Sequence, residues 1–132
     1  MLRAYKIGDE LKMELTPESE ADYFGDVEHS KDCLQWYETY TCVDKDNNVC
    51  GILCFYWQGD KTYNVWGLFD KNRGYKTLRD WKRLVDIYHE RGNILYTVST
   101  VGERQDKMHK FLGCRKQKMM GDKQVWVRYL AL

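Results

Sequence analysis

One feature constrains the fold of this chain more than any other: an amphipathic helix that lies between two strand-like segments. Its apolar residues recur every three to four positions over residues 75–91, so they share one helical face. They are Leu78, Trp81, Leu84, Val85 and Tyr88. Residues 62–69 and 94–99, on either side, are rich in β-forming side chains. Because a helical crossover returns the chain in its original direction, these two strands are predicted to run parallel and to splay apart.

The other segments complete a mixed arrangement of helices and strands. Further strands are predicted over residues 3–7, 37–43, 49–57, 114–119 and 124–130. Thr16 and Pro17 begin a helix that ends near Gly25, because threonine suits the N-cap and proline the first turn. A last helix is predicted over residues 103–112. The predicted fold class is therefore α/β (α+β), with a mixed, mostly antiparallel sheet of about six to seven strands and about three to four flanking helices.

The chain is expected to form a single domain over residues 1–132. Its length suffices for a hydrophobic core, and no Ser/Gly-rich run suggests a linker. Hydrophobic residues make up 43% and charged residues 31%, which is typical of a globular protein. No apolar run approaches the roughly 20 residues of a membrane span, and the first residues lack a signal-peptide pattern. A cytoplasmic protein with no membrane partner is expected.

Neither the cysteines nor the acidic segment 44–48 predicts a metal site. The five cysteines are odd in number and irregularly spaced, which indicates small buried side chains rather than disulfides. Asp44, Asp46 and Asn48 begin like a calcium loop, but the glycine and glutamate that such a loop needs are absent. The segment is therefore predicted to be a hairpin turn.

Charge is unevenly distributed along the chain, although its net charge is only +1. Residues 9–32 include nine acidic side chains and two lysines, whereas residues 71–83 and 104–128 are strongly basic. Such a polarised surface suits a protein partner or self-association. The basic segments carry no motif for reading DNA grooves or RNA, so nucleic acid is not the expected partner.

Residues 102–114, Gly-Glu-Arg-Gln-Asp-Lys-Met-His-Lys-Phe-Leu-Gly-Cys, resemble the late helix of the GNAT acetyltransferases. The family's aliphatic-glycine ending matches Leu112 and Gly113, and its frequent tyrosine falls on His109. Its initial asparagine and closing aromatic are replaced here by glycine and cysteine. The order of elements resembles the GNAT fold over nearly the whole chain. In length and layout, the chain is similar to short GNAT-like proteins of podophages, including internal virion proteins.

This resemblance implies a site for acetyl-CoA, whose pyrophosphate rests on backbone amides where a strand turns into a helix. The matching loop is residues 70–78, in which Lys76 and Leu78 replace two small residues of the family pattern. Because bulky side chains there would crowd the phosphates, binding of acetyl-CoA is predicted to be weak or absent. The candidate cofactor-binding residues are Arg73, Gly74, Tyr75 and Lys76.

The resemblance also implies a base that deprotonates the attacking amine and an acid that protonates the departing thiolate. The strand expected to carry the base, residues 62–69, has no carboxylate, so Asp70 directly after it is the candidate base. His109 replaces the acidic tyrosine and is the candidate acid. The alternative for His109 is an exposed histidine on the helix surface with no catalytic role.

Two functions are compatible with these patterns. The first is a phage-encoded structural or interaction protein that keeps the GNAT fold as a scaffold, inside the virion or against a host factor in the host cytoplasm. The alternative is an active acetyl-CoA-dependent N-acyltransferase that acts on a primary amine. The altered loop and the missing base favour a protein without catalytic activity.

Overall fold

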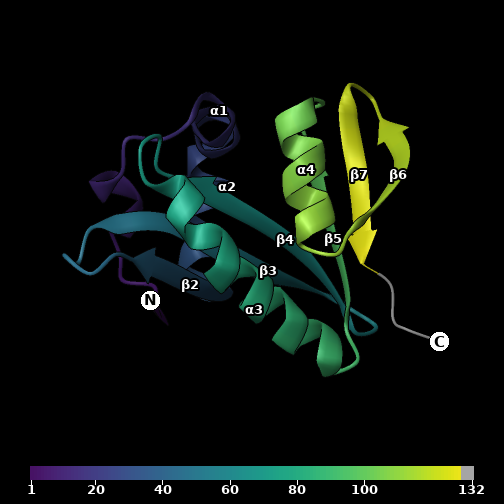
Figure 1. The fold of residues 1–132 in the computed structure, drawn as a ribbon, viewed down its shortest axis with the longest axis horizontal. Helices are drawn as coiled ribbons and strands as arrows, with labels where there is room; N and C mark the ends of the chain where they lie inside the picture. The colour runs from purple at the N-terminus through teal and green to yellow at the C-terminus, as the bar shows by residue number, and fades with distance from the viewer. Residues whose placement is uncertain (129–132) are drawn as a thin grey trace.

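The computed structural model describes residues 1–128, which form a seven-stranded sheet with helices on both faces (Figure 1). The strands lie in the order β1-β2-β3-β4-β5-β7-β6. Their bounds are β1 Leu2–Ala4, β2 Glu38–Val43, β3 Val49–Gly59, β4 Thr62–Phe69, β5 Ile94–Ser99, β6 Arg115–Met120 and β7 Lys123–Arg128. All neighbouring strands in this sheet are antiparallel except β4 and β5. The predicted mixed, mostly antiparallel sheet is confirmed.

Within residues 1–128, four α-helices and two short 3-10 helices accompany the sheet. They are α1 Pro17–Gly25, α2 Val27–Trp36, α3 Leu78–Glu90, α4 Glu103–Phe111, η1 Asp9–Lys12 and η2 Gly74–Thr77. The N-terminus of α1 lies where it was predicted, because the Thr16 side chain accepts a hydrogen bond from the backbone N–H of Ser19 and Pro17 takes the first helical position. None of the helices in this part of the chain is long and apolar enough to cross a bilayer.

Strands β4 and β5 run parallel, as the α3 crossover predicts, but they pair over a short distance. Their ladder joins Thr62–Asn64 to Ile94–Tyr96 and then stops. Beyond it, β4 stays paired with β3 as far as Phe69, and β5 stays paired with β7 as far as Ser99. The two strands therefore diverge, and a gap opens between their C-terminal halves.

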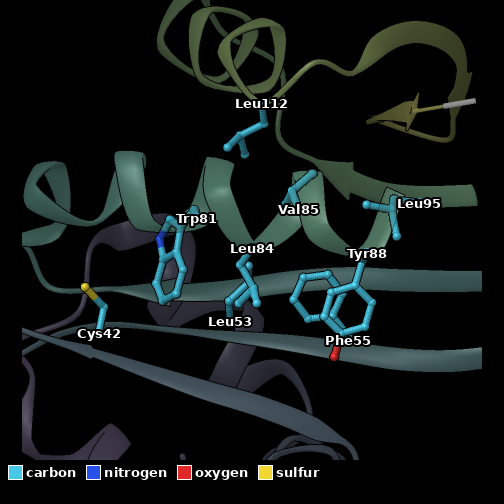
Figure 2. Close-up of a cluster of buried hydrophobic side chains, with 9 residues drawn as sticks. All are labelled: Cys42, Leu53, Phe55, Trp81, Leu84, Val85, Tyr88, Leu95 and Leu112. Carbon is cyan, nitrogen blue, oxygen red and sulfur yellow. The ribbon is translucent and has the colours of Figure 1, made fainter. Parts of the chain in front are cut away.

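Buried side chains form a core on each face of the sheet. On one face, the apolar stripe of α3 packs against the strands and Leu112, and the ring of Tyr88 stacks on Phe55 with centroids 3.8 Å apart (Figure 2). On the other face, α1 and α2 bury Tyr23 and Leu34. Helix α3 and strand β3 approach each other closely at Gly51. A Cβ atom there would lie 3.0 Å from Cζ2 of Trp81 and 3.2 Å from the carbonyl oxygen of Leu68.

Two elements differ from the prediction. Helix α2 is not predicted by the sequence, although the Asp26 side chain caps it by accepting the backbone N–H of His29. Strand β1 is shorter than the predicted residues 3–7, because Gly8 turns the chain into η1 with a φ of 94°. Residues 129 and 130 of the predicted last strand lie outside the described residues. The cysteines within residues 1–128 are all free thiols, and four of the five are buried.

Candidate functional site

A cavity of about 380 Å³ lies at the gap between β4 and β5. Trp66 and Gly67 of β4 and the segment 97–100 at the end of β5 line it. Its remaining walls come from α1, from α4 and from the loop and η2 that connect β4 to α3. Helices α1 and α4 lie at the same end of the sheet, where the strands diverge (Figure 1). The fold thus brings segments from both halves of the chain to one cavity.

The main chain of β4 presents polar groups to this gap. The carbonyl of Lys61, just before β4, accepts a hydrogen bond from the N–H of Ile94 in β5. At the other end of β4, the N–H of Phe69 donates to Oγ of Ser19 at 3.0 Å. The odd-numbered residues of β4 therefore direct their backbone N–H and C=O groups away from β3. Because this direction alternates along a strand, Val65 and Gly67 direct theirs into the gap. The ladder with β5 ends at Asn64 and Tyr96, so the carbonyl of Val65 and both backbone groups of Gly67 lie beyond it.

His109 of α4 lies in the cavity wall and is only 4% exposed, so the surface position considered from the sequence is wrong. Its Nδ1 lies 2.7 Å from the carbonyl oxygen of Gln105. A carbonyl only accepts, so this contact places the hydrogen on Nδ1 and leaves Nε2 as the proton-accepting nitrogen of the neutral ring. Burial lowers the pKa of His109 below its usual 6.5, against the opposing effects of the Gln105 hydrogen bond and the Asp106 charge. The ring is therefore neutral at pH 7.

The orientation of this imidazole is fixed by its neighbours on the sheet. Trp126 of β7 is fully buried and stacks against His109. The indole Nε1 of Trp126 donates to Oγ of Ser99 at 3.2 Å. The ammonium of Lys116 lies 5.7 Å from the centre of the indole and 3.0 Å from Oδ2 of Asp106. These contacts join α4 to β5, β6 and β7 beside the cavity.

Asp70, the other catalytic candidate, also lines the cavity, but backbone groups engage both of its carboxylate oxygens. Oδ1 accepts the N–H of Glu14 at 3.0 Å, and Oδ2 accepts the N–H groups of Asn72 and Arg73 at 2.9 Å each. The residue is 3% exposed. Asp70 therefore ties the segment before α1 to the loop after β4, and it holds that loop in shape.

The structure separates the candidate cofactor-binding residues into two groups. Gly74 and Tyr75 line the cavity, whereas Arg73 and Lys76 are not part of its walls. The guanidinium of Arg73 points instead to the β2–β3 turn, where its Nε lies 3.7 Å from Oδ2 of Asp44.

Backbone amides of the same loop are engaged within the loop. The N–H of Gly74 bonds to the carbonyl of Asp70, and the N–H of Lys76 bonds to the carbonyl of Arg73. The N–H groups of Asn72 and Arg73 are held by the Asp70 carboxylate. The loop that would cradle a pyrophosphate thus uses these donors for its own conformation.

Charged residues that the sequence did not single out line the cavity on two sides. Glu18 and Asp22 come from α1, and their spacing of four residues is the signal that could have placed them on one helical face. Asp22 keeps contact with solvent, yet the surrounding protein raises its pKa by excluding water, with Lys123 opposing this effect and Glu18 adding to it. Cationic side chains line the cavity from the loop and from α4. They are Lys71, Arg104 and Lys107.

Solved acetyltransferase structures superpose on this chain. A spermidine N-acetyltransferase chimera from Vibrio cholerae and hSSAT matches with a TM-score of 0.68 and 16% identity, covering 98% of this chain and 94% of that one. The Bacillus subtilis acetyltransferase in complex with CoA matches with a TM-score of 0.66 and 13% identity, over 90% and 97% of the two chains. A GNAT superfamily phosphinothricin acetyltransferase from Sinorhizobium meliloti in complex with AcCoA matches with a TM-score of 0.64 and 15% identity, covering 99% of this chain and 88% of that one.

The sequence itself matches no protein-family model and no curated protein. The structural likeness extends over nearly the whole of each chain, and at identities of 13–16% it concerns the fold. Strand order, the single parallel pair within residues 1–128 and the diverging strands agree with it. This chain therefore has the fold of the GNAT acetyltransferases.

Proposed function

We propose that this chain is an N-acyltransferase that moves an acyl group from a thioester of the acetyl-CoA type to a primary amine. The observation that carries the proposal is the cavity at the gap between β4 and β5, with the neutral ring of His109 in its wall. The three structures compared above support it, because all are acetyltransferases and two are complexes with CoA or AcCoA. None of the three is described as a virion protein, so they favour this activity over the phage structural role.

The gap suits the thioester arm of such a donor. The arm is an extended chain that contains amide groups, and an extended amide chain binds well along an unpaired strand edge. The carbonyl of Val65 and the backbone groups of Gly67, which lie beyond the β4–β5 ladder, offer that edge. An N–H of this edge that meets the thioester oxygen would also stabilise the negative charge of the tetrahedral intermediate. The donor itself supplies an acyl group that is activated by its bond to sulfur.

In this proposal, His109 moves the proton of the reaction. As the amine nitrogen forms its bond to the acyl carbon, Nε2 of His109 accepts a proton from that nitrogen. The carbon–sulfur bond then breaks, and His109 returns the same proton to the departing thiolate. The neutral amine loses one proton and the sulfur gains one, so the reaction needs no other acid. Asp70 acts as a positioning residue, because its oxygens hold the loop through backbone N–H groups.

The acidic side chains of α1 suit the other substrate. Glu18 and Asp22 line the cavity from α1, and their negative charge attracts an ammonium ion to it. The ammonium ion loses one proton to solvent before it reacts, and Nε2 of His109 accepts the next one as the nitrogen attacks the acyl carbon. The primary amine therefore approaches from the α1 side in this proposal.

Release of free thiol from acetyl-CoA in the presence of a panel of primary amines tests the proposal. We expect saturable thiol release that requires the amine and that falls at least about tenfold in His109→Ala, because general acid–base catalysis contributes that much or more. His29→Ala, at an exposed position on α2, is the matched control and should keep the wild-type rate. A folded protein that releases no thiol with any amine would overturn the proposal.

A further inference from the structure

The anion-binding capacity of the β4–α3 loop is reduced by a negative charge of its own. The Asp70 carboxylate, which lines the cavity, already accepts the N–H groups of Asn72 and Arg73, so these donors are not available to a phosphate. A phosphate at this position would have to displace that carboxylate or lie beside it, and like charges at such short range repel. The guanidinium of Arg73 faces Asp44, outside the cavity, and does not compensate.

Besides Lys71 of the loop, which lies 3.7 Å from Glu14, positive charge reaches the cavity from its other side. Arg104 and Lys107 line the cavity from the first turns of α4. Arg104 makes no ion pair within residues 1–128, and the pair of Lys107 with Glu103, at 3.2 Å, is exposed on both sides and therefore weak. The N-cap residue Gly102 adds no capping side chain, and Glu103 and Asp106 place negative charge in the first turn, so it is the side chains of Arg104 and Lys107 that bring positive charge here.

We propose that the phosphate groups of the donor bind to the side chains of Arg104 and Lys107, and not to the backbone of residues 70–78. This inference rests on the proposed function and specifies how its donor is held. A guanidinium suits the task, because its fork of N–H donors matches two phosphate oxygens at once. Binding through exposed side chains is also more sensitive to salt than binding through a buried backbone nest.

Calorimetric titration with two donors separates the phosphate contacts from the rest of the site. Acetyl-CoA carries the phosphates, and acetyl-pantetheine carries the same thioester arm without them. We expect Arg104→Ala to raise the Kd for acetyl-CoA at least about tenfold, since hydrogen bonds to charged groups contribute about 1.5–3 kcal/mol. Lys107→Ala should have a smaller effect in the same direction. The Kd for acetyl-pantetheine should stay unchanged in both variants.

Two control variants remove the same charge outside the cavity. Arg73→Ala breaks only the contact with Asp44, and Lys110→Ala alters an exposed position on α4 that is not part of the cavity wall. Both should leave the Kd for acetyl-CoA within about twofold, on the scale of weak surface charges. The inference is wrong if Arg73→Ala weakens acetyl-CoA as much as Arg104→Ala does, or if Arg104→Ala has no effect.

The outcome for acetyl-pantetheine distinguishes the two proposals. If both donors bind and Arg104→Ala changes neither Kd, the phosphate site is placed wrongly while the acyltransferase proposal stands. If neither donor binds the folded wild-type protein, the proposed function fails and the phosphate site fails with it. Circular dichroism of each variant shows whether the fold is kept.

Discussion

The imidazole of His109 lies parallel to the indole of Trp126, with the ring centroids 4.9 Å apart and the planes inclined by 11°. The two residues come from α4 and β7, and the indole is anchored in turn by Ser99 of β5. This arrangement removes water from one face of the imidazole and fixes the direction of its nitrogens. A histidine that is held in this way has a defined protonation state and a defined reach into the cavity.

The first prediction concerns the titration of His109. We expect its pKa to lie below the usual 6.5, because burial disfavours the imidazolium form. The pH dependence of the His109 ring-proton signal in NMR spectra, assigned by comparison with His109→Gln, measures this value. The same signal in the urea-unfolded chain provides the reference. A midpoint at or above that of the unfolded chain would contradict the assigned environment.

The second prediction links this pKa to stability. A histidine whose pKa is lowered by folding binds its proton more readily in the unfolded chain, so the free energy of unfolding decreases as the pH falls through 6.5 towards the folded value. Above 6.5 the contribution is constant. Urea unfolding at pH 7.5 and pH 5.5 should therefore show a larger loss for the wild type than for His109→Gln. Equal losses in the two proteins would rule out this linkage.

The third prediction concerns the Asp70 carboxylate. Asp70→Ala leaves the N–H groups of Glu14, Asn72 and Arg73 without their acceptor, and we expect it to lower the free energy of unfolding by about 3 kcal/mol or more. Asp70→Asn keeps one acceptor oxygen and should cost less than the alanine variant. Asp32→Ala, at an exposed position on α2, is the control and should stay within about 0.5 kcal/mol of the wild type. A neutral Asp70→Ala would show that these bonds do not hold the loop.

The fourth prediction concerns the contact between α3 and β3. Gly51→Ala places a Cβ atom 3.0 Å from Cζ2 of Trp81, so we expect a loss of about 1–3 kcal/mol from overpacking. Gly25→Ala is the matched control, because a Cβ atom at that position meets nothing within 4 Å and no positive φ is required. Thermal unfolding should therefore give a lower melting temperature for Gly51→Ala than for Gly25→Ala. Equal melting temperatures would mean that α3 can move away from the sheet at little cost.

The fifth prediction concerns association through the uneven charge of the chain. Part of the acidic segment 9–32 is internal, since Asp9 is fully buried and bonds to the guanidinium of Arg3 at 2.7 and 2.9 Å. The acidic side chains that remain exposed, together with the basic α4 and β6, still suit a charged protein partner or a second copy. Any such complex should weaken as salt rises. Sedimentation of the purified protein across a salt series tests this prediction. A monomer at every salt concentration would contradict self-association.

The parts of the fold that could be predicted from the sequence are those with strong local periodicity. The stripe of α3 and the β-rich segments beside it determine the crossover and hence the parallel pair. Helix α2 was missed because only two of its three buried residues, Cys33 and Leu34, are apolar, and the third is Ser30. A helix with so weak a pattern is stabilised by its cap and by packing against the sheet.

The candidate site was harder to predict because its properties arise from contacts between distant segments. The burial of His109 depends on Trp126, which the sequence does not connect to it. Likewise, the residue type of Asp70 suits a catalytic base, but only the structure shows that the N–H of Glu14 and the loop amides occupy its oxygens. The sequence tells which chemical group a residue carries. The protonation state and the hydrogen bonds of that group depend on neighbours that are remote along the chain.

The gap between β4 and β5 also bears on how a site of this kind tolerates mutation. It is bordered by peptide groups, and every residue type except proline carries the same N–H and C=O. A substitution at Val65 that preserves the strand leaves these donors and acceptors in place. Selection on such a site acts on the path of the main chain more than on the identity of its side chains. A low overall identity, such as the 13–16% found with the three acetyltransferase structures, is therefore compatible with a site built in this way.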